Sequence, residues 1–246
     1  MGSARPGCDN ARTMDVNQIK EWIAAGQFDE VESAWMSAAE SQGGIPADQA
    51  GEILAALVAA GKDDLADAVG WALLEERKEL DSAAKRLDLA KTMALAVPLS
   101  GDLREQAMEL YRELHGRHPH FDALVKASDL KGAQTPRRAF ATLDLCLALS
   151  DGGYVSNRFR NQVAQVIGFN GALGEYELED LADGRVHVEA RRLADEFETI
   201  GETDFRVLCK RDPARLGELF FDDPAKVLIG VCQSHDGRID AVDLKD

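Results

Sequence analysis

Clustered histidines are the first feature of this sequence with the chemistry of a site, because imidazole nitrogens bind zinc and other transition metals. His115, His118 and His120 fall within the six residues HGRHPH. A glycine and a proline inside this run mark the end of a helix, and no cysteine or acid completes a ligand set. The run is interpreted as the solvated C-terminal turn of a helix, with a metal site as the alternative.

A second stretch, CQSHDGRIDAVD at 232–243, resembles the second half of an EF-hand calcium loop. However, Cys232 stands where the first ligand acid belongs, and Asp243 replaces the bidentate glutamate at the twelfth position. Loss of the first acid removes a principal calcium ligand. The alternative is a corner between two helices, closed by Asp236 and Gly237. We expect no metal at either stretch.

Side chains with the chemistry for catalysis are present but not arranged for it. Asp223 in FFDDP precedes a proline, so it fits a helix N-cap better than one half of an acid–base pair. Cys209 precedes Lys210 and Arg211, whose charges favour a lowered pKa of the thiol, although its apolar surroundings favour a buried thiol. The motifs G-x-S-x-G, H-E-x-x-H and G-x-G-x-x-G and the P-loop are absent. We therefore predict no catalytic residues and no cofactor.

The chain is acidic along its whole length. Its 246 residues include 28 Lys and Arg against 44 Asp and Glu, a net charge of −16, and residues 1–150 and 151–246 carry −8 each. Nucleic-acid backbones are bound by clustered Lys and Arg, so direct sequence-specific binding of nucleic acid is not expected. There is no run of 18 apolar residues, and the four cysteines form no C-x-x-C pair. These features predict a cytoplasmic protein with no membrane span.

The elements that would position a site begin with repeated helices. The sequence AAGQFDE at 24–30 returns as AAGKDDL at 59–65, an offset of 35 residues. That offset is close to the period of tetratricopeptide-like helix–turn–helix repeats, in which Gly26 and Gly61 would turn the corners. We predict a disordered leader at 1–14 and a helical-repeat domain at 15–150. An ordinary helical bundle is the alternative.

Beyond residue 150 the hydrophobic period changes from that of helices to that of strands. Residues 175–179 and 185–189 alternate strictly, and Asp183-Gly184 between them favours a hairpin. Residues 162–169 predict a third strand. The register that brings opposite charges together pairs Leu178 with Val186, Tyr176 with Val188, Glu179 with Arg185 and Glu177 with His187. The fold class is therefore mainly α, with residues 151–246 forming a small α+β domain that has a short antiparallel sheet of SH3 or Tudor type.

The second half also carries a succession of motifs with a family resemblance. The motifs are G-x-Y at 152–154, R-F at 158–159, V-I-G-F-N at 166–170, D-F-R-V-L-x-K-x-D-P at 204–213, D-P-A at 223–225 and H-D-G-R-I-D at 235–240. This succession resembles the long N-terminal region of some bacterial Gre-type transcript-cleavage elongation factors. In those chains a helical-repeat segment precedes a small CarD- or Tudor-like sheet.

The resemblance implies a non-catalytic module that works at RNA polymerase, with the small sheet as its docking surface. The residues that carry the family's motif, and hence the expected partner contacts, are Arg158, Phe159, Arg160, Phe169 and Asn170. A different interpretation places both phenylalanines in the core and leaves the arginines solvated.

The chain departs from the family in two respects. It lacks the long coiled-coil hairpin with an acidic tip and the second globular domain of Gre factors. Cleavage activity is therefore not implied, and the chain is expected to be either a stand-alone relative or an incomplete reading frame. The alternative function is a general tetratricopeptide-like scaffold that binds an unrelated protein.

Overall fold

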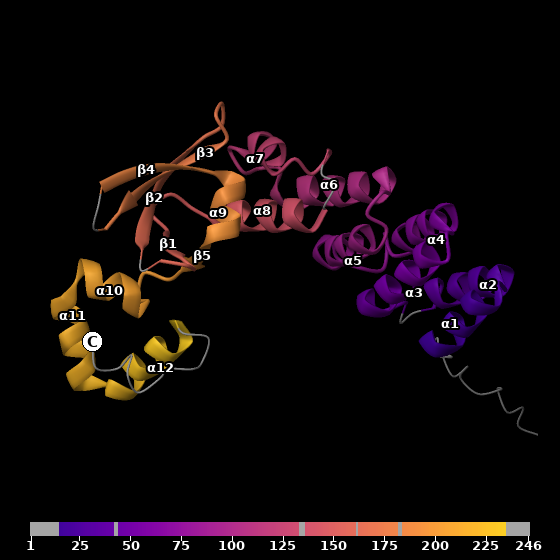
Figure 1. Cartoon of the computed structure of the whole chain (residues 1–246), viewed down its shortest axis with the longest axis horizontal. Helices are drawn as coiled ribbons and strands as arrows, with labels where there is room; N and C mark the ends of the chain where they lie inside the picture. The colour runs from indigo at the N-terminus through magenta and orange to yellow at the C-terminus, as the bar shows by residue number, and fades with distance from the viewer. Residues whose placement is uncertain (1–14, 42–43, 133–135, 161, 182–183, 235–246) are drawn as a thin grey trace, which may run out of the picture. The chain divides into compact units, whose positions relative to one another are not determined.

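The computed structural model describes residues 15–41, 44–132, 136–160, 162–181 and 184–234 (Figure 1). These residues form two compact units, of which the first contains residues up to 117 together with 130–137. The second contains 118–129 and the residues from 138 onward. The predicted leader at 1–14 and the calcium-like half-loop from residue 235 lie outside the described residues.

The described part of the first unit contains six helices that pair as consecutive hairpins. They are α1 (Val16–Ala25), α2 (Phe28–Ala39), α3 (Ala47–Ala59), α4 (Asp63–Glu76), α5 (Ala83–Ala96) and α6 (Gly101–His115). Within the hairpins α1 contacts α2, α3 contacts α4 and α5 contacts α6. Between hairpins, α3 contacts both α1 and α5, while α4 contacts both α2 and α6. The first helices of successive hairpins thus contact one another, as do the second helices. This is the tetratricopeptide-like arrangement that the 35-residue offset predicts.

The two repeated corners have the same backbone structure. Gly26 and Gly61 adopt left-handed φ angles of 73° and 71°, which residues with a side chain rarely adopt. In both corners the amide after the glycine donates to the carbonyl five residues back, which closes a Schellman-type helix end. The pairs are Gln27 to Trp22 and Lys62 to Leu57, each at 2.9 Å.

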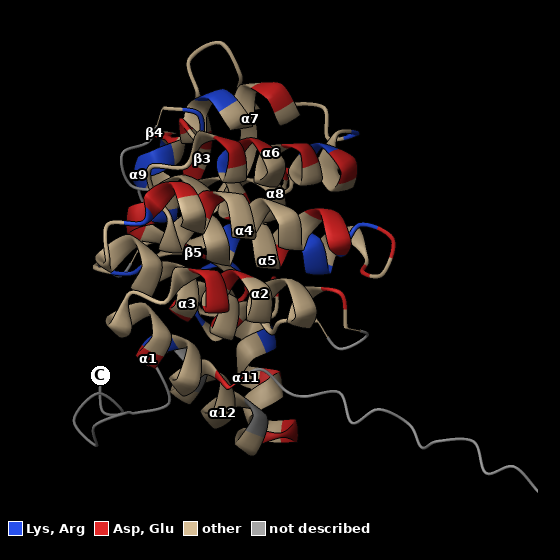
Figure 2. Ribbon diagram, turned by 90° about the vertical axis from the view of Figure 1, so that its right-hand side faces the viewer, with Lys and Arg blue, Asp and Glu red and all other residues tan. Residues whose placement is uncertain are grey.

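The acids that follow each corner have a structural role. Asp29 and Glu30 occupy the first turn of α2, and Asp63 and Asp64 occupy the first turn of α4. Negative charge there stabilises the exposed amides at the positive end of the helix. Figure 2 shows Asp and Glu, in red, on many of the helices, so the acidic residues are not confined to one helix.

Trp35 holds the first two hairpins together. It is fully buried, and its indole Nε1–H donates to the carbonyl of Val69 at 2.9 Å, which joins α2 to α4. Ile53 and Leu57 of α3 are also fully buried. The apolar stripes of these helices therefore form a core between neighbouring hairpins, because one hairpin alone cannot cover its own apolar face.

The second unit contains a five-stranded antiparallel sheet within the described residues. The strands are β1 (Tyr154–Asn157), β2 (Val163–Asn170), β3 (Glu175–Asp180), β4 (Gly184–Glu189) and β5 (Phe197–Ile200). Their order is β4-β3-β2-β1-β5, and the short helix α9 (Ala190–Glu196) connects β4 to β5. Strands β1 to β4 thus form a meander, and β5 closes the sheet beside β1.

The predicted hairpin register is confirmed at all four pairs. Tyr176 lies opposite Val188, Leu178 opposite Val186, Glu177 opposite His187 and Glu179 opposite Arg185. The Arg185 guanidinium lies 2.8 Å from the Glu177 carboxylate and 3.6 Å from that of Glu179. The strand expected at 162–169 is β2, whereas β1 and β5 were not predicted.

Two helices belong with this sheet rather than with the repeat. They are α7 (Phe121–Ser128) and α8 (Pro136–Ala148), and most of α8 falls in the second unit. The division between the units therefore lies earlier than residue 150, where the period of the sequence changes. Helix α8 is tied to the sheet by the Tyr176 hydroxyl, which donates to the Cys146 carbonyl at 3.2 Å in a buried position.

Removal of that hydroxyl has a definite expected cost. The Cys146 carbonyl is one of the last four of α8, which have no partner within the helix. Tyr176→Phe keeps the ring but deletes the donor, so we expect the free energy of unfolding to fall by about 1 kcal/mol. Urea titration followed by circular dichroism measures this change, and Tyr154→Phe is the matched comparison, because the buried Tyr154 hydroxyl has no hydrogen-bond partner among the described residues. A variant as stable as the parent would contradict the structural role of the bond.

Three further helices follow the sheet. They are α10 (Phe205–Arg211), α11 (Pro213–Asp222) and α12 (Pro224–Ser234). Asp212 caps α11, since its carboxylate accepts the Arg215 amide at 3.0 Å, and Asp223, the predicted N-cap residue, directly precedes α12. No helix in the described ranges has both the length and the apolar character to cross a membrane.

Candidate functional site

The five predicted docking residues fall at two places on the sheet. Arg158, Phe159 and Arg160 lie in the connection between β1 and β2, while Phe169 and Asn170 lie at the far end of β2. Strand β2 is eight residues long, so at about 3.4 Å per residue its two ends are separated by more than 20 Å. The five residues therefore cannot form one contact patch, and the two groups are considered separately.

The first group forms a surface that we call the RFR tip, residues Arg158, Phe159 and Arg160. All three residues are exposed, and Phe159 retains 75% of its accessible surface. The interpretation that placed Phe159 in the core is therefore wrong. An exposed aromatic residue flanked in sequence by two arginines has the composition found at the centres of protein–protein interfaces.

Backbone hydrogen bonds hold the RFR tip in one conformation. The Phe159 amide donates to the side-chain oxygen of Asn157 at 2.9 Å, and Asn157 is itself buried. The Arg158 amide donates to the Glu196 carbonyl at the end of α9 at 2.8 Å. The Gln162 amide donates to the Arg160 carbonyl at 2.7 Å. The backbone of the tip is thus anchored to β1 and α9, so binding would need to order mainly the exposed side chains.

The charges beside the tip are partly compensated. Glu196 forms a 2.8 Å ion pair with Arg192 one turn earlier in α9. The hydrogen bond from Arg192 holds the pKa of the Glu196 carboxyl below its ordinary value, and the positive charge of Arg160 adds to this effect. Glu196 is therefore ionised at neutral pH and partly balances the positive charge around Phe159.

The second group has a structural role. Phe169 lies 4.7 Å from Tyr176 and 5.6 Å from His120, measured between ring centroids, and forms part of an aromatic cluster. Asn170 accepts the amides of Ala172 and Leu173 at 3.1 and 3.3 Å, which shapes the turn between β2 and β3. These contacts within the chain explain the positions of Phe169 and Asn170, and neither position requires a binding partner.

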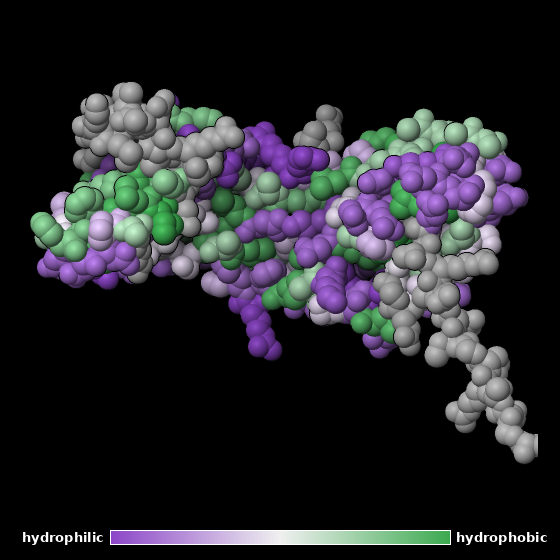
Figure 3. Space-filling view, turned by 90° about the horizontal axis from the view of Figure 1, so that it is seen from below, coloured by the Kyte–Doolittle hydropathy of each residue, from purple (hydrophilic) through white to green (hydrophobic). Residues whose placement is uncertain are grey.

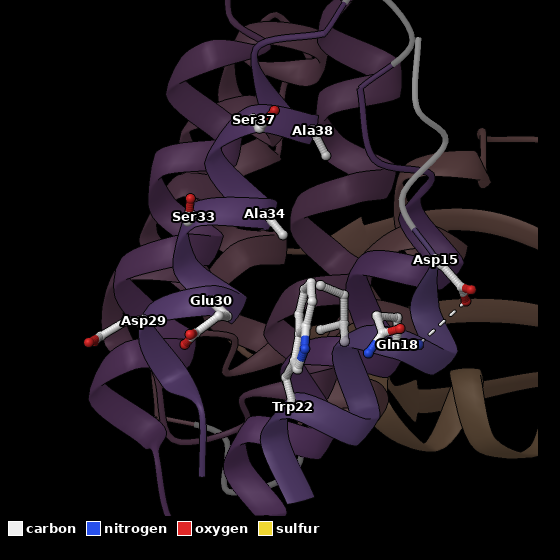
Figure 4. A pocket seen from close by; sticks show the side chains of 10 residues that line it. Asp15, Gln18, Trp22, Asp29, Glu30, Ser33, Ala34, Ser37 and Ala38 are labelled. Atoms are coloured by element: carbon white, nitrogen blue, oxygen red, sulfur yellow. Dashed lines mark hydrogen bonds between the residues drawn. The ribbon is translucent and has the colours of Figure 1, made fainter. Parts of the chain in front are cut away.

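A separate groove lies on the first helical hairpin (Figure 4). It has a volume of about 680 Å³ and is formed by residues of α1 and α2 together with the Asp15 cap. The half-buried Trp22 ring stands in it, and Asp15, Asp29 and Glu30 are the charged residues that line it. Ser33 and Ser37 line the α2 side (Figure 4). This groove was not predicted from the sequence, in which its one signal is Trp22, one turn before the Gly26 corner.

The histidine run does not form a metal site in the described residues. His115 is the last residue of α6, as the interpretation of a helix end predicted. His118 and His120 lie 6.1 Å apart between ring centroids, and the His118 ring nitrogen accepts the His120 amide. Across the described ranges, no three His, Cys, Asp or Glu residues are grouped as metal ligands would be.

The exposure of the cysteines differs from expectation at Cys209, which was expected to be buried and is exposed. Cys146 is buried, Cys232 is half-buried and Cys209 is exposed, while Cys8 lies outside the described residues. The pKa of Cys209 is raised by partial desolvation and not lowered by the neighbouring Lys210 and Arg211. Burial raises the pKa of Cys146 to about 11. A raised thiol pKa is the opposite of what a nucleophile requires.

Comparisons of the chain with protein families, with curated proteins and with solved structures give no match. The RFR tip, the groove on α1 and α2 and the motif succession between residues 152 and 240 are therefore the features of the chain that bear on its function.

Proposed function

We propose that the protein is a non-catalytic interaction module that docks on RNA polymerase through the RFR tip. The observation that carries the proposal is Phe159, which is exposed to 75% at the centre of a hydrogen-bonded loop between two arginines. The choice of polymerase as partner rests on the resemblance of the motifs between residues 152 and 240 to the Gre-type extension, a succession that includes Arg158 and Phe159.

The chemistry of the tip defines the surface that it fits. An aromatic ring contributes most binding free energy when a pocket on the partner removes it from water. The flanking guanidinium groups would then pair with carboxylates around that pocket. The rest of the chain carries a large negative charge, so a strongly acidic partner would be repelled except at the tip. The expected binding site on the polymerase is therefore an apolar pocket with an acidic rim.

The test compares tagged full-length protein with its Phe159→Ala variant, first in capture from a cell lysate and then in binding to purified polymerase. We expect polymerase subunits to be enriched by the parent. We expect affinity to fall about 30-fold in the variant, which corresponds to about 2 kcal/mol for an aromatic hot spot. Leu173→Ala is the matched control, because Leu173 is 66% exposed at the other end of β2. Equal capture by parent and Phe159→Ala would refute docking through the tip.

The groove on α1 and α2 favours a second candidate function, a scaffold that binds a basic segment of an unrelated protein. Its lining offers a tryptophan ring and three carboxylates, Asp15, Asp29 and Glu30, and no basic residue among those that the structure describes. Lys and Arg side chains bind to such a combination through cation–π contacts and ion pairs. Glu30→Lys reverses one of these charges and leaves the tip unchanged. A partner lost from Glu30→Lys but retained by Phe159→Ala would favour the scaffold over the polymerase module.

A further inference from the structure

Two surfaces of this chain are complementary in charge, and each contains an aromatic ring. The groove on α1 and α2 contains the Trp22 ring and the carboxylates of Asp15, Asp29 and Glu30 (Figure 4). The RFR tip presents an exposed phenylalanine with an exposed arginine on each side. The described lining of the groove includes no basic residue, and residues 152–174, which contain the tip, include no Asp or Glu. Each surface therefore has the chemistry that the other would bind.

The carboxylates of the groove are open to an incoming cation. Asp29 and Glu30 are exposed and form no ion pair with the residues that the structure describes. Lys20, the lysine of α1, is paired instead with Glu52 of α3 at 2.6 Å. The groove volume of about 680 Å³ lies within the roughly 300–1,000 Å³ of ordinary ligand pockets. An aromatic side chain with a flanking arginine can therefore enter beside Trp22.

The neighbours of each exposed aromatic residue decide which one suits this groove. Figure 3 shows apolar surface, in green, where α11 and α12 lie, but Phe220 and Phe221 of α11 are followed directly by two aspartates. Trp71 of α4 has Glu75 one helical turn later. The carboxylates of the groove would repel these acids. Among the exposed aromatic residues that the structure describes, Phe159 is thus the one with basic neighbours.

We infer that the RFR tip of one copy of this chain binds to the groove on α1 and α2 of a second copy. Phe159 packs beside Trp22, and the flanking arginines pair with Asp29 and Glu30. The net charge of −16 opposes contact between copies in general, so the association depends on these two oppositely charged surfaces. The contact joins unlike surfaces, and each copy supplies a tip and a groove. This inference goes beyond polymerase docking and does not depend on it.

The first measurement is the mass of the full-length protein in solution, by sedimentation equilibrium between about 5 and 300 µM. We expect reversible association with a dissociation constant of about 10–100 µM for each contact, as a small contact with one aromatic anchor would give. A wild-type protein that is monomeric across the whole range would overturn the inference.

Two variants locate the contact by complementation. Phe159→Asp removes the ring of the tip and adds a charge that the groove repels, whereas Glu30→Lys reverses a charge in the groove. We expect each variant alone to associate at least about 10-fold more weakly than the wild type. An equimolar mixture should form a 1:1 dimer, because one variant keeps an intact groove and the other an intact tip. A mixture that associates no better than the separate variants would refute the assignment.

Matched controls separate this contact from general effects of charge. Glu32→Lys makes the same charge change at an exposed position of α2 that does not line the groove, so it should associate like the wild type. Circular dichroism checks that each variant retains its helix content. Glu30→Lys should lose association and keep polymerase capture. A monomeric wild type that still captures polymerase would therefore overturn this inference alone, while association without capture would overturn only polymerase docking.

Discussion

Replacement of Trp35 by alanine is expected to lower the free energy of unfolding of the helical unit by about 3–5 kcal/mol. The side chain is fully buried between α2 and α4, so its removal leaves a large cavity between two hairpins. It also deletes the indole donor to the Val69 carbonyl. A loss of this size is a large fraction of the 5–15 kcal/mol that typically stabilises a domain.

The measurement is denaturant unfolding followed by tryptophan fluorescence. The three tryptophans, Trp22, Trp35 and Trp71, all lie in the first unit, so the signal reports on that unit alone. Trp71→Ala is the control, because Trp71 is 47% exposed and its loss should cost less than about 1 kcal/mol. Trp35→Phe keeps most of the side-chain volume but removes the indole donor, so it measures the contribution of the hydrogen bond separately from that of the cavity. Equal destabilisation by Trp35→Ala and Trp71→Ala would contradict the proposed role of Trp35 between the hairpins.

The second large effect concerns the thiol of Cys146. Desolvation by burial raises its pKa from 9.0 to about 11, although the Tyr176 hydrogen bond opposes the shift. A two-unit rise leaves about 100-fold less thiolate at neutral pH, and the thiolate is the reactive form. We therefore expect iodoacetamide to alkylate Cys146 at least about 100-fold more slowly in the native protein than in the denatured protein. Peptide-resolved mass spectrometry at pH 8 measures both rates.

Exposed Cys209 is the internal control, because it should react in the native state without unfolding. The sign of the pH effect follows from the raised pKa of Cys146. Its contribution to stability is complete below pH 9 and is lost as pH rises toward about 11, where the buried thiol ionises. Rapid native labelling of Cys146 at pH 8 would show that this end of α8 is open to solvent.

Sequence patterns predicted the parts of the fold that local chemistry determines. The two corners need a left-handed residue, and glycine supplies it at Gly26 and Gly61. The hairpin register follows from opposite charges at Glu179 and Arg185 together with strict alternation. Strand β1 was missed because all four of its residues are buried, which removes the alternation that marks a strand. Strand β5 was missed because it is only four residues long and begins directly after α9.

The candidate site was less predictable than the fold. The motif that joins Arg158 to Phe159 identified the RFR tip, but exposure of Phe159 depends on the Asn157 and Glu196 bonds that turn the loop outward. The same motif succession included Phe169, which the β2–β3 ladder places beside Tyr176 instead. The pKa of Cys209 depends on partial desolvation, which its neighbours in sequence did not indicate. In each case the deciding contact comes from another strand or helix.

The stacking of hairpins has a consequence for how the helical unit opens. Each hairpin contacts its immediate neighbours, so α3–α4 has a partner on two sides while α1–α2 has its described partner on one. In such a linear array the free energy of opening is a sum over neighbours, and end units exchange with solvent before inner ones. Trp35 links the terminal hairpin to the next through its hydrogen bond to the Val69 carbonyl. The groove on α1 and α2 therefore lies on the segment that frays first, and an occupant of that groove would slow backbone amide exchange throughout the terminal hairpin.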